Sequence, residues 1–279
     1  MHDGRVEPYA APRPDVRFED CLWYHTMDVP GHGVVEGAWD LRGGASRYLG
    51  DVEFRGKCVL EMGTASGFLC FHMERAGAEV VAFDLDSGAD WDIVPYARAD
   101  RVAFAATRRV EIERLHDAFW FCHKAFRSKA RAVYGTAYAV PDAIGPVDVA
   151  TFGSILLHLR DPFRALESAL RLTKHTVIVT DLVPRGYRPL ARVRKALSWM
   201  PLRRARKAAR RMGAATTDFI PDASRGDPMG TWWHLSPDTV VRMLAVLGFE
   251  ETRVTFHSQP LTGRDVDLFT VVAQRTAGP

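Results

Sequence analysis

A glycine-containing loop at residues 61–67 carries the clearest chemical pattern in the chain. Its residues are Glu61, Met62, Gly63, Thr64, Ala65, Ser66 and Gly67. The first glycine permits a tight turn, and the second lets a ligand and the following helix approach the backbone closely. The spacing is neither G-x-G-x-x-G nor a P-loop, since no Gly-Lys-Ser/Thr follows. The loop therefore favours a ligand without a pyrophosphate.

A second carboxylate, Asp84, stands 17 residues after Gly67 at the end of the next apolar run. At such a position a carboxylate accepts hydrogen bonds from both hydroxyls of a ribose. Taken singly, Glu61 and Asp84 are also explained as helix caps or solvent-facing residues. Together, at two strand ends with this spacing, they predict a nucleoside site.

The elements that must position these residues alternate between short apolar runs and helical patterns, which is typical of parallel βαβ units. We predict strands at 57–62, 79–84, 131–135, 147–152 and 176–181, and helices at 68–76 and 163–172. A helix at 237–247 ends before Gly248, and two closing strands follow at 250–256 and 265–274. The fold class expected is α/β, with a Rossmann-like, seven-stranded, mostly parallel sheet covered by helices on both faces. Its ligand lies at the carboxyl ends of strands one and four.

The loop and the two acidic strand ends resemble the class I S-adenosylmethionine-dependent methyltransferases. Residues 59–67 match the first motif of that class, and Phe83-Asp84 matches its second acidic strand end. The resemblance implies S-adenosylmethionine as cofactor and S-adenosylhomocysteine as product. It also implies that Gly63 and nearby backbone meet the methionine part and Asp84 the ribose. The complete set of predicted cofactor contacts is Glu61, Gly63, Thr64, Ser66, Gly67, Asp84, Thr136, Ala137 and Ser154.

The adenine end of this predicted site departs from the class pattern. Residues 134–138 stand where the adenine-contacting loop of the class follows the third strand. Many members have an acidic residue directly after the glycine, whereas this chain has Thr136 after Gly135. The resemblance therefore places Thr136 and Ala137 at the adenine without the usual acidic contact.

A narrower resemblance covers most of the chain. Residues 23–25, 152–158, Trp232-Trp233 and 235–237 are similar to the group related to wobble-uridine tRNA (carboxy)methyltransferases. Many bacterial relatives of that group are thought to act on other substrates. Carboxymethyl transfer would need a cationic partner such as Arg42, and ordinary methyl donation is the simpler expectation.

His158 is the predicted general base. Methyl transfer is an in-line displacement that needs an aligned nucleophile and usually a way to remove a proton. His158 follows the fourth strand on the side where the sheet order reverses, and histidine titrates near neutral pH. It suits a hydroxyl, amine or carboxylic acid acceptor. The alternative is that His158 only orders its own loop through a backbone hydrogen bond.

Two aromatic clusters are the predicted substrate contacts: Tyr24 with His25 beside Trp23, and Trp232 with Trp233 and His234. Such clusters wall a pocket and shelter a sulfonium by cation–π attraction, or they belong to the core. Asp181, at the end of the fifth strand, is a substrate ligand or a loop anchor. We expect no catalytic metal, because the His and Asp residues lack ligand spacing.

One segment is strongly basic. Residues 185–211 hold eleven Lys/Arg and no Asp/Glu, so the remainder carries a charge of about −8. From Leu190 the pattern predicts two short amphipathic helices interrupted at Pro201. The segment is a solvated face, a site for an anionic small substrate or carrier-linked acyl group, an RNA-binding element, or, less well supported, a membrane-surface contact. RNA is a less favoured partner than a small molecule.

Composition is that of a globular protein of 279 residues, with four cysteines that form no CxxC pair. No apolar run is long enough to span a bilayer, and a cytoplasmic protein is expected. We divide the chain into an N-terminal extension (1–50), a methyltransferase domain (51–183 and 213–279) and a basic helical insertion (184–212) that covers the substrate site. The expected function is methylation of oxygen or nitrogen on a small, specialised-metabolite substrate. The alternatives are a tRNA-modifying methyltransferase and a non-methylating cofactor-binding regulator or lyase. The sequence does not decide the oligomeric state.

Overall fold

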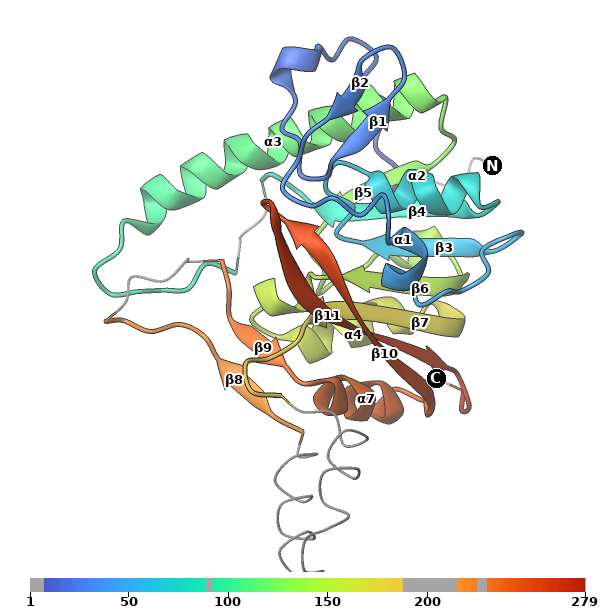
Figure 1. The fold of residues 1–279 in the computed structure, drawn as a ribbon, viewed down its shortest axis with the longest axis vertical. Helices are drawn as coiled ribbons and strands as arrows, with labels where there is room; N and C mark the ends of the chain where they lie inside the picture. The colour runs from blue at the N-terminus through green and yellow to red at the C-terminus, as the bar shows by residue number, and fades with distance from the viewer. Residues whose placement is uncertain (1–7, 89–91, 188–214, 225–229, 279) are drawn as a thin grey trace, which may run out of the picture.

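The computed structural model describes residues 8–88, 92–187, 215–224 and 230–278. Its centre is a seven-stranded sheet with the order β10-β11-β7-β6-β3-β4-β5 (Figure 1). The five strands from β7 to β5 run parallel, and β11 pairs antiparallel with both β7 and β10. The predicted Rossmann-like, mostly parallel sheet is confirmed. The bounds of the sheet strands are β3 (Cys58–Met62), β4 (Glu79–Leu85), β5 (Arg131–Gly135), β6 (Val147–Gly153), β7 (Thr173–Leu182), β10 (Glu251–Leu261) and β11 (Arg264–Gln274).

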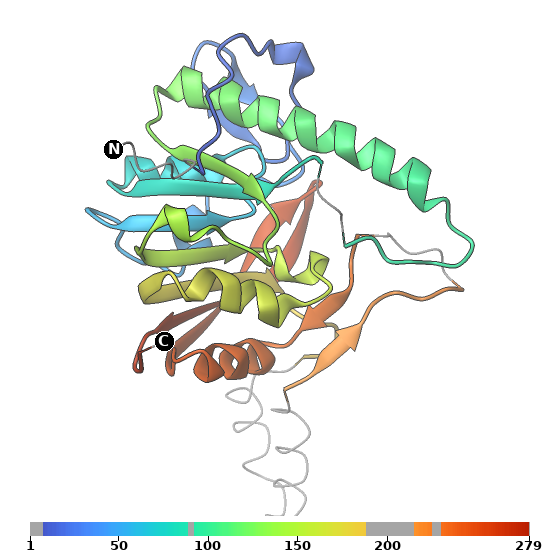
Figure 2. The same ribbon diagram turned by 180° about the vertical axis from the view of Figure 1, so that it is seen from behind.

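Helices cover both faces of the sheet because its inner strands are apolar on both sides (Figures 1 and 2). Val59 and Val80 belong to one core, and their chain neighbours Leu60 and Val81 belong to the other. The first core includes α1 (Ala45–Tyr48), α2 (Phe68–Arg75) and α3 (Arg101–Phe126). The second includes α4 (Pro162–Leu170) and α7 (Pro237–Val246). The short 3-10 helices are η1 (Phe18–Asp20), η2 (Asp142–Ile144) and η3 (Leu156–His158).

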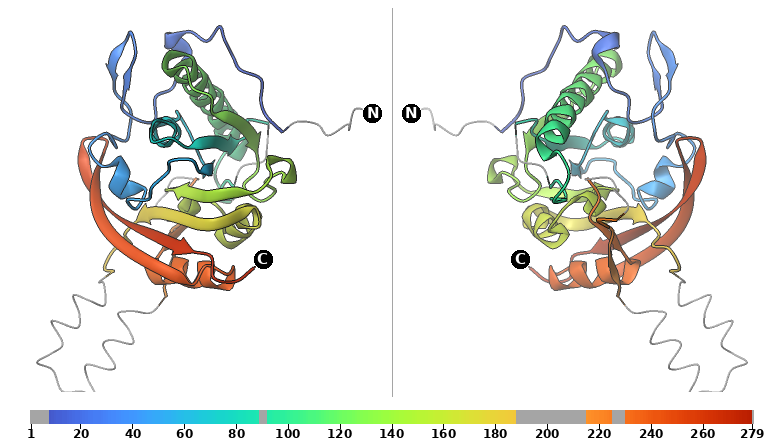
Figure 3. Two further views of the ribbon diagram at one scale, coloured as in Figure 1. Left: turned by 90° about the vertical axis from the view of Figure 1, so that its right-hand side faces the viewer. Right: turned by 90° about the vertical axis from the view of Figure 1, so that its left-hand side faces the viewer.

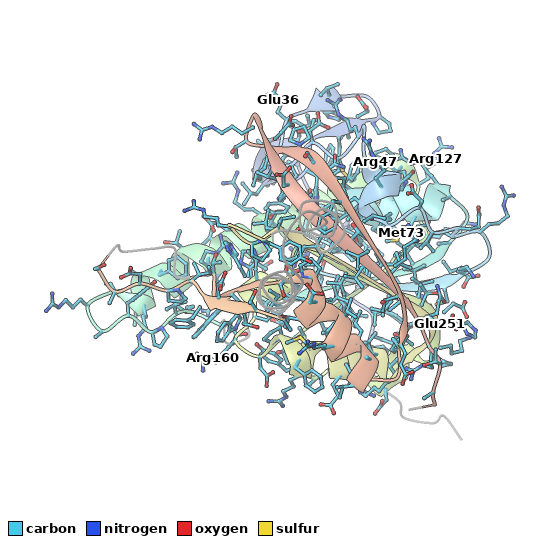
Figure 4. The ribbon with its side chains drawn as sticks, turned by 60° about the horizontal axis from the view of Figure 1, so that its bottom comes forward. Glu36, Arg47, Met73, Arg127, Arg160 and Glu251 are labelled. Atoms are coloured by element: carbon cyan, nitrogen blue, oxygen red, sulfur yellow. The ribbon has the colours of Figure 1, made fainter. Side chains whose placement is uncertain are left out.

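One contact of the N-terminal segment with the main body is at the tip of the β10–β11 hairpin (Figure 3). It forms the small hairpin of β1 (Met27–Val29) and β2 (Gly33–Val35). Thr262, at the hairpin turn, donates its N–H to the carbonyl of Ala38 at 2.7 Å, and Trp39 bridges to Leu261. The same turn lies near Glu36 in Figure 4. Trp39 and Met27 are buried in the first core, so this segment closes one side of the body.

The predicted elements recur with ends moved by a few residues, except that β10 extends five residues further than predicted, to Leu261. The long helix α3 was not delimited by the sequence pattern. Its 26 residues start after Asp100, whose side chain caps Ala103 N–H, but its first turns stand away from the sheet and are largely exposed. An exposed stretch of helix shows no apolar stripe, and the amphipathic pattern begins only near Ile112.

A second antiparallel pair, β8 (Thr217–Phe219) and β9 (Trp233–Leu235), lies beyond the carboxyl edge of the parallel strands. The two predicted helices of the basic segment lie outside the described residues, apart from the first three positions of that segment. Among the described helices, none combines the length and apolar character that a membrane span requires.

Candidate cofactor site

The loop after β3 turns tightly over the edge of the sheet. Gly63 has φ +82°, and a Cβ added there would come within 2.8 Å of Ile155 Cδ1. Gly67, at φ +88°, caps α2, and its added Cβ would meet the rings of Phe71 and Phe119 at 2.5 and 2.9 Å. The positive φ angles and these close contacts explain why both positions hold glycine, while the approach of a ligand to Gly67 stays a prediction. At Gly67 the close neighbours are two aromatic rings of the core.

Glu61 is the residue before last in β3 and is 3% exposed. Thr64 Oγ1 donates a hydrogen bond of 2.6 Å to Glu61 Oε2. Burial raises the pKa of Glu61 to about 7, against the lowering effect of that hydrogen bond. Ionisation of this carboxyl is therefore poised near neutrality, where a nearby cation would favour the charged form.

Asp84 lies half-buried at the end of β4, next to the loop. Its Oδ2 accepts the N–H of Ala65 at 2.6 Å, and its Oδ1 accepts the N–H of Leu85 at 2.7 Å. Each oxygen keeps further acceptor capacity, because a carboxylate offers about four lone pairs. Burial raises the pKa of Asp84, and the nearby His116 opposes this shift. The carboxylate thus connects β4 to the loop and retains acceptor capacity for two hydroxyl donors.

Ser66 connects the loop to the N-terminal segment. Its Oγ accepts the backbone N–H of His25 at 3.1 Å and lies 3.2 Å from His25 Nδ1. His25 is buried, and burial lowers its pKa to about 3, so the ring is neutral at physiological pH. Tyr24, also predicted to contact substrate, accepts a 3.2 Å hydrogen bond from Trp39 Nε1. His25 therefore supports the loop through Ser66, and the role of both residues toward a substrate stays a prediction.

The two other predicted cofactor segments lie at the same edge of the sheet. Thr136 and Ala137 follow β5, and Thr136 Oγ1 accepts the N–H of Tyr138 at 3.3 Å. Ser154 follows β6 in a left-handed conformation (φ +50°), with its Oγ 3.0 Å from Tyr48 Oη. The fold therefore brings all nine predicted cofactor residues to the carboxyl ends of β3, β4, β5 and β6. A small hollow at this edge is lined by Tyr48, Glu61, Gly63, Thr151, Gly153 and Thr180, among others.

His158 ends the single turn η3 beside β6. Its Nδ1 lies 2.6 Å from the carbonyl oxygen of Gly230, which only accepts, so Nδ1 carries the proton. In the neutral ring, Nε2 then keeps its lone pair. The side chain is exposed, yet the chain around it limits hydration of the ring and lowers its pKa, while the Gly230 hydrogen bond opposes this shift.

The Trp232 cluster forms a cover next to His158, because the Gly230 carbonyl that pairs with His158 precedes Trp232 by two residues. Trp232 is buried, its N–H pairs with Leu157 O at 2.8 Å, and its indole donates to Asp92 O at 2.5 Å. Trp233 donates its indole N–H to Arg160 O at 3.1 Å. His234 is half-buried in β9, and burial lowers its pKa. Both indole N–H groups already donate to backbone carbonyls. A substrate could therefore contact only the ring faces of these tryptophans, and that contact stays a prediction.

The last two sequence predictions concern the role of Asp181 and a catalytic metal. Asp181 is buried, its Oδ1 accepts Leu182 N–H at 2.7 Å, and burial raises its pKa to about 7. Within the described ranges, no group of three His, Cys, Asp or Glu side chains is placed to hold a metal ion.

Sequence reasoning missed Tyr48, Gly230 and Asp92. Asp92 Oδ2 accepts Arg160 N–H at 2.8 Å and also pairs with the Tyr138 hydroxyl, so it joins three loops at the cover. These contacts join residues 46 to 140 positions apart in sequence. No local pattern in the chain would have indicated them.

Comparison with known proteins identifies the class. A family model described as a methyltransferase domain matches residues 41–250, well over half of the chain. The chain therefore belongs to this methyltransferase domain family, and its fold is the seven-stranded Rossmann-like methyltransferase fold. No curated protein matches it significantly.

Several solved structures share the fold. Two are of the N-terminal domain of EvdMO1, one with S-adenosylhomocysteine bound and one in the presence of S-adenosylhomocysteine and D-fucose. They give TM-scores of 0.51 and 0.50 at 16% and 17% identity, covering 92% of this chain and 93% of theirs. A third is 1,6-didemethyltoxoflavin-N1-methyltransferase from Burkholderia thailandensis, with a TM-score of 0.49 and 14% identity over 85% of this chain and 78% of that one.

Proposed function

We propose that the protein is an S-adenosylmethionine-dependent methyltransferase that acts on oxygen or nitrogen of a small molecule, with His158 as general base. The observation that carries the base assignment is the 2.6 Å hydrogen bond between His158 Nδ1 and Gly230 O. A ring held in this tautomer keeps Nε2 as the proton acceptor, as a base needs. Its position after β6 is at the point where the sheet order reverses.

The residues at the carboxyl edge fit an S-adenosyl cofactor. Asp84 has acceptor capacity for two ribose hydroxyls, and Gly63 lets the loop turn tightly against Ile155 at the end of β3. Glu61, with its pKa near 7, suits the ammonium group of the methionine part. The cofactor would supply the methyl group, while the chain orients the acceptor and accepts its proton.

Two other functions are kept as alternatives. A tRNA substrate is favoured by the basic segment at 185–211 and by the narrower resemblance to the wobble-uridine group. A carboxymethyl donor is less supported, because Arg42 is already paired with Asp40 at 2.8 Å and lies 3.5 Å from Asp28. A non-methylating regulator or lyase would bind the cofactor without an acceptor.

The test measures release of S-adenosylhomocysteine from S-adenosylmethionine in the presence of candidate acceptors. One panel holds small hydroxyl, amine and carboxylic acid compounds, with sugars first because D-fucose accompanies the EvdMO1 domain. A second panel holds bulk tRNA at several salt concentrations. Turnover of a small molecule that is insensitive to salt supports the proposal. Steeply salt-dependent turnover confined to tRNA would transfer the assignment to RNA.

A further inference from the structure

We propose that Tyr48 is a positioning residue, which holds the Ser154 hydroxyl so that it donates its proton to the carboxylate of the bound cofactor. This inference rests on the proposed function, because it requires an S-adenosyl ligand at the loop. It assigns a role to the short helix α1, which the sequence pattern left without one.

The pair is fixed by close packing. Tyr48 is 3% exposed, and a Cβ added at Gly153 would lie 3.1 Å from Tyr48 Oη. Ser154 donates its backbone N–H to Thr180 O at 2.7 Å, and its Oγ lies 3.0 Å from Tyr48 Oη. Because backbone and side chain of Ser154 are both held, its hydroxyl oxygen has a defined place at the end of β6.

The direction of the hydrogen bond follows from burial. Among the residues that the structure describes, Ser154 Oγ is the hydrogen-bond partner of Tyr48 Oη. Burial raises the pKa of Tyr48 far above its usual value, so the phenol keeps its proton. A buried phenol proton without an acceptor is costly, and Tyr48 therefore donates to Ser154. The proton of Ser154 is then available for a ligand.

A chain of buried polar groups holds both ends of α1. The Tyr48 carbonyl accepts hydrogen bonds from Thr180 Oγ1 at 2.6 Å and Thr270 Oγ1 at 3.2 Å. Thr270 in turn lies 2.9 Å from His257 Nε2. Gln259 Nε2 contacts both Gly44 O and His257 Nδ1 at 3.3 Å, which places the histidine proton on Nε2. Gly44 precedes α1, so the helix is held before its first turn and at its last residue.

The charges at the carboxyl ends of the parallel strands indicate which part of the cofactor Ser154 would contact. Glu61 and Gly63 both line the hollow, and a negative charge on Glu61 favours the ligand's ammonium group and repels its carboxylate. A neutral hydroxyl donor just after the neighbouring strand, β6, is suited to that carboxylate, since hydrogen bonds to charged acceptors are the stronger ones. Ser154 and Glu61 would thus separate the two charges of the amino-acid part.

Calorimetry with two probes tests the inference without any acceptor substrate. S-adenosylhomocysteine carries the amino-acid part, and 5′-methylthioadenosine lacks it. We expect Tyr48→Phe and Ser154→Ala each to weaken S-adenosylhomocysteine binding by about tenfold. The double variant should lose no more than about tenfold, because Tyr48 acts through Ser154. Binding of 5′-methylthioadenosine should be unchanged in all three.

Tyr187→Phe is the matched control, because it removes a phenol that donates to Asp238 at 2.9 Å near α7. It should leave both affinities unchanged. Additive losses in the double variant, an equal loss for both probes, or no loss with Tyr48→Phe would overturn the inference while the proposed function stands. If the unaltered protein binds neither probe, the proposed function itself fails. Ser154→Ala keeps the test decisive if Tyr48→Phe fails to fold.

Discussion

Thr64 donates its hydroxyl to Glu61 at 2.6 Å, and the carboxyl group that accepts it has its pKa raised to about 7 by burial. The hydrogen bond favours the charged form of Glu61, whereas burial favours the neutral form, and burial dominates. The loop therefore holds a carboxyl group whose charge changes within the physiological range. A cationic ligand shifts this balance toward the carboxylate.

Cofactor affinity should rise with pH through this pKa. Below pH 7, Glu61 must release a proton to pair with the ligand's ammonium group, and above pH 7 it is already ionised. Between pH 6 and 7.5, we expect the Kd of S-adenosylhomocysteine to fall by about eightfold, the ratio of the ionised fractions at those two pH values. Glu61→Gln should bind more weakly and lose most of this slope. An unchanged slope in the variant, measured by calorimetry, would assign the titration to another group.

Removing the Ser66 hydroxyl should destabilise the protein. Ser66→Ala leaves the buried N–H of His25 without its acceptor, which costs about 1–3 kcal/mol in the free energy of unfolding. Ser258→Ala, which removes an exposed hydrogen bond to Asp267, should cost about 0.5 kcal/mol or less. Urea denaturation measures both. Equal losses would mean that the N-terminal segment is not held to the loop through Ser66.

Gly67→Ala should destabilise the protein more than the same substitution at a glycine that has a similar φ but no close neighbours. Gly67→Ala combines a left-handed backbone with contacts to Phe71 and Phe119, for an expected loss of about 2–5 kcal/mol. Gly31 has φ +82° and no neighbour within 4 Å of an added Cβ. Gly31→Ala therefore measures the backbone cost alone, about 1–2 kcal/mol. If both variants lose the same stability, the two rings move aside and packing plays no part.

The centre of the sheet was predictable because its inner strands are buried on both faces and are bounded by glycine or acidic ends. Lengths were less predictable at the edge, where β10 continues through Pro260 to reach the N-terminal segment, an extension set by contacts with Trp39 and Ala38. The first half of α3 is exposed, so its sequence lacks the periodicity that burial imposes.

The candidate site also contains residues that the sequence predicts and residues that it does not. Glu61, Gly63 and Asp84 were predictable because parallel strands end at one edge of the sheet, and chain order alone places them there. Tyr48 and Gly230 were not, because their roles come from contacts with Ser154 and His158 across distant parts of the chain. Residue type alone does not reveal a supporting partner.

His158→Gln should separate chemistry from cofactor binding. The glutamine keeps a polar side chain of similar reach but removes the base, so we expect turnover to fall by about 10²–10⁴-fold, the usual contribution of a general base. The Kd of S-adenosylhomocysteine should change by less than about twofold, because the predicted cofactor contacts lie on the loop, on Asp84 and on Ser154 and do not include His158. Single-turnover rates and calorimetry provide the two measurements, using the acceptor identified in the screen.

His175→Gln is the control for that substitution. His175 is exposed in β7, at the opposite end of the strand from Asp181, and lies 3.9 Å from Asp148. It should change neither turnover nor affinity. If His158→Gln instead weakens cofactor binding in proportion to its loss of turnover, His158 supports the site through the Gly230 hydrogen bond. An unchanged turnover in His158→Gln would contradict the general-base role. An amide cannot take the proton that the methyl acceptor loses, so replacing a true base must slow the reaction.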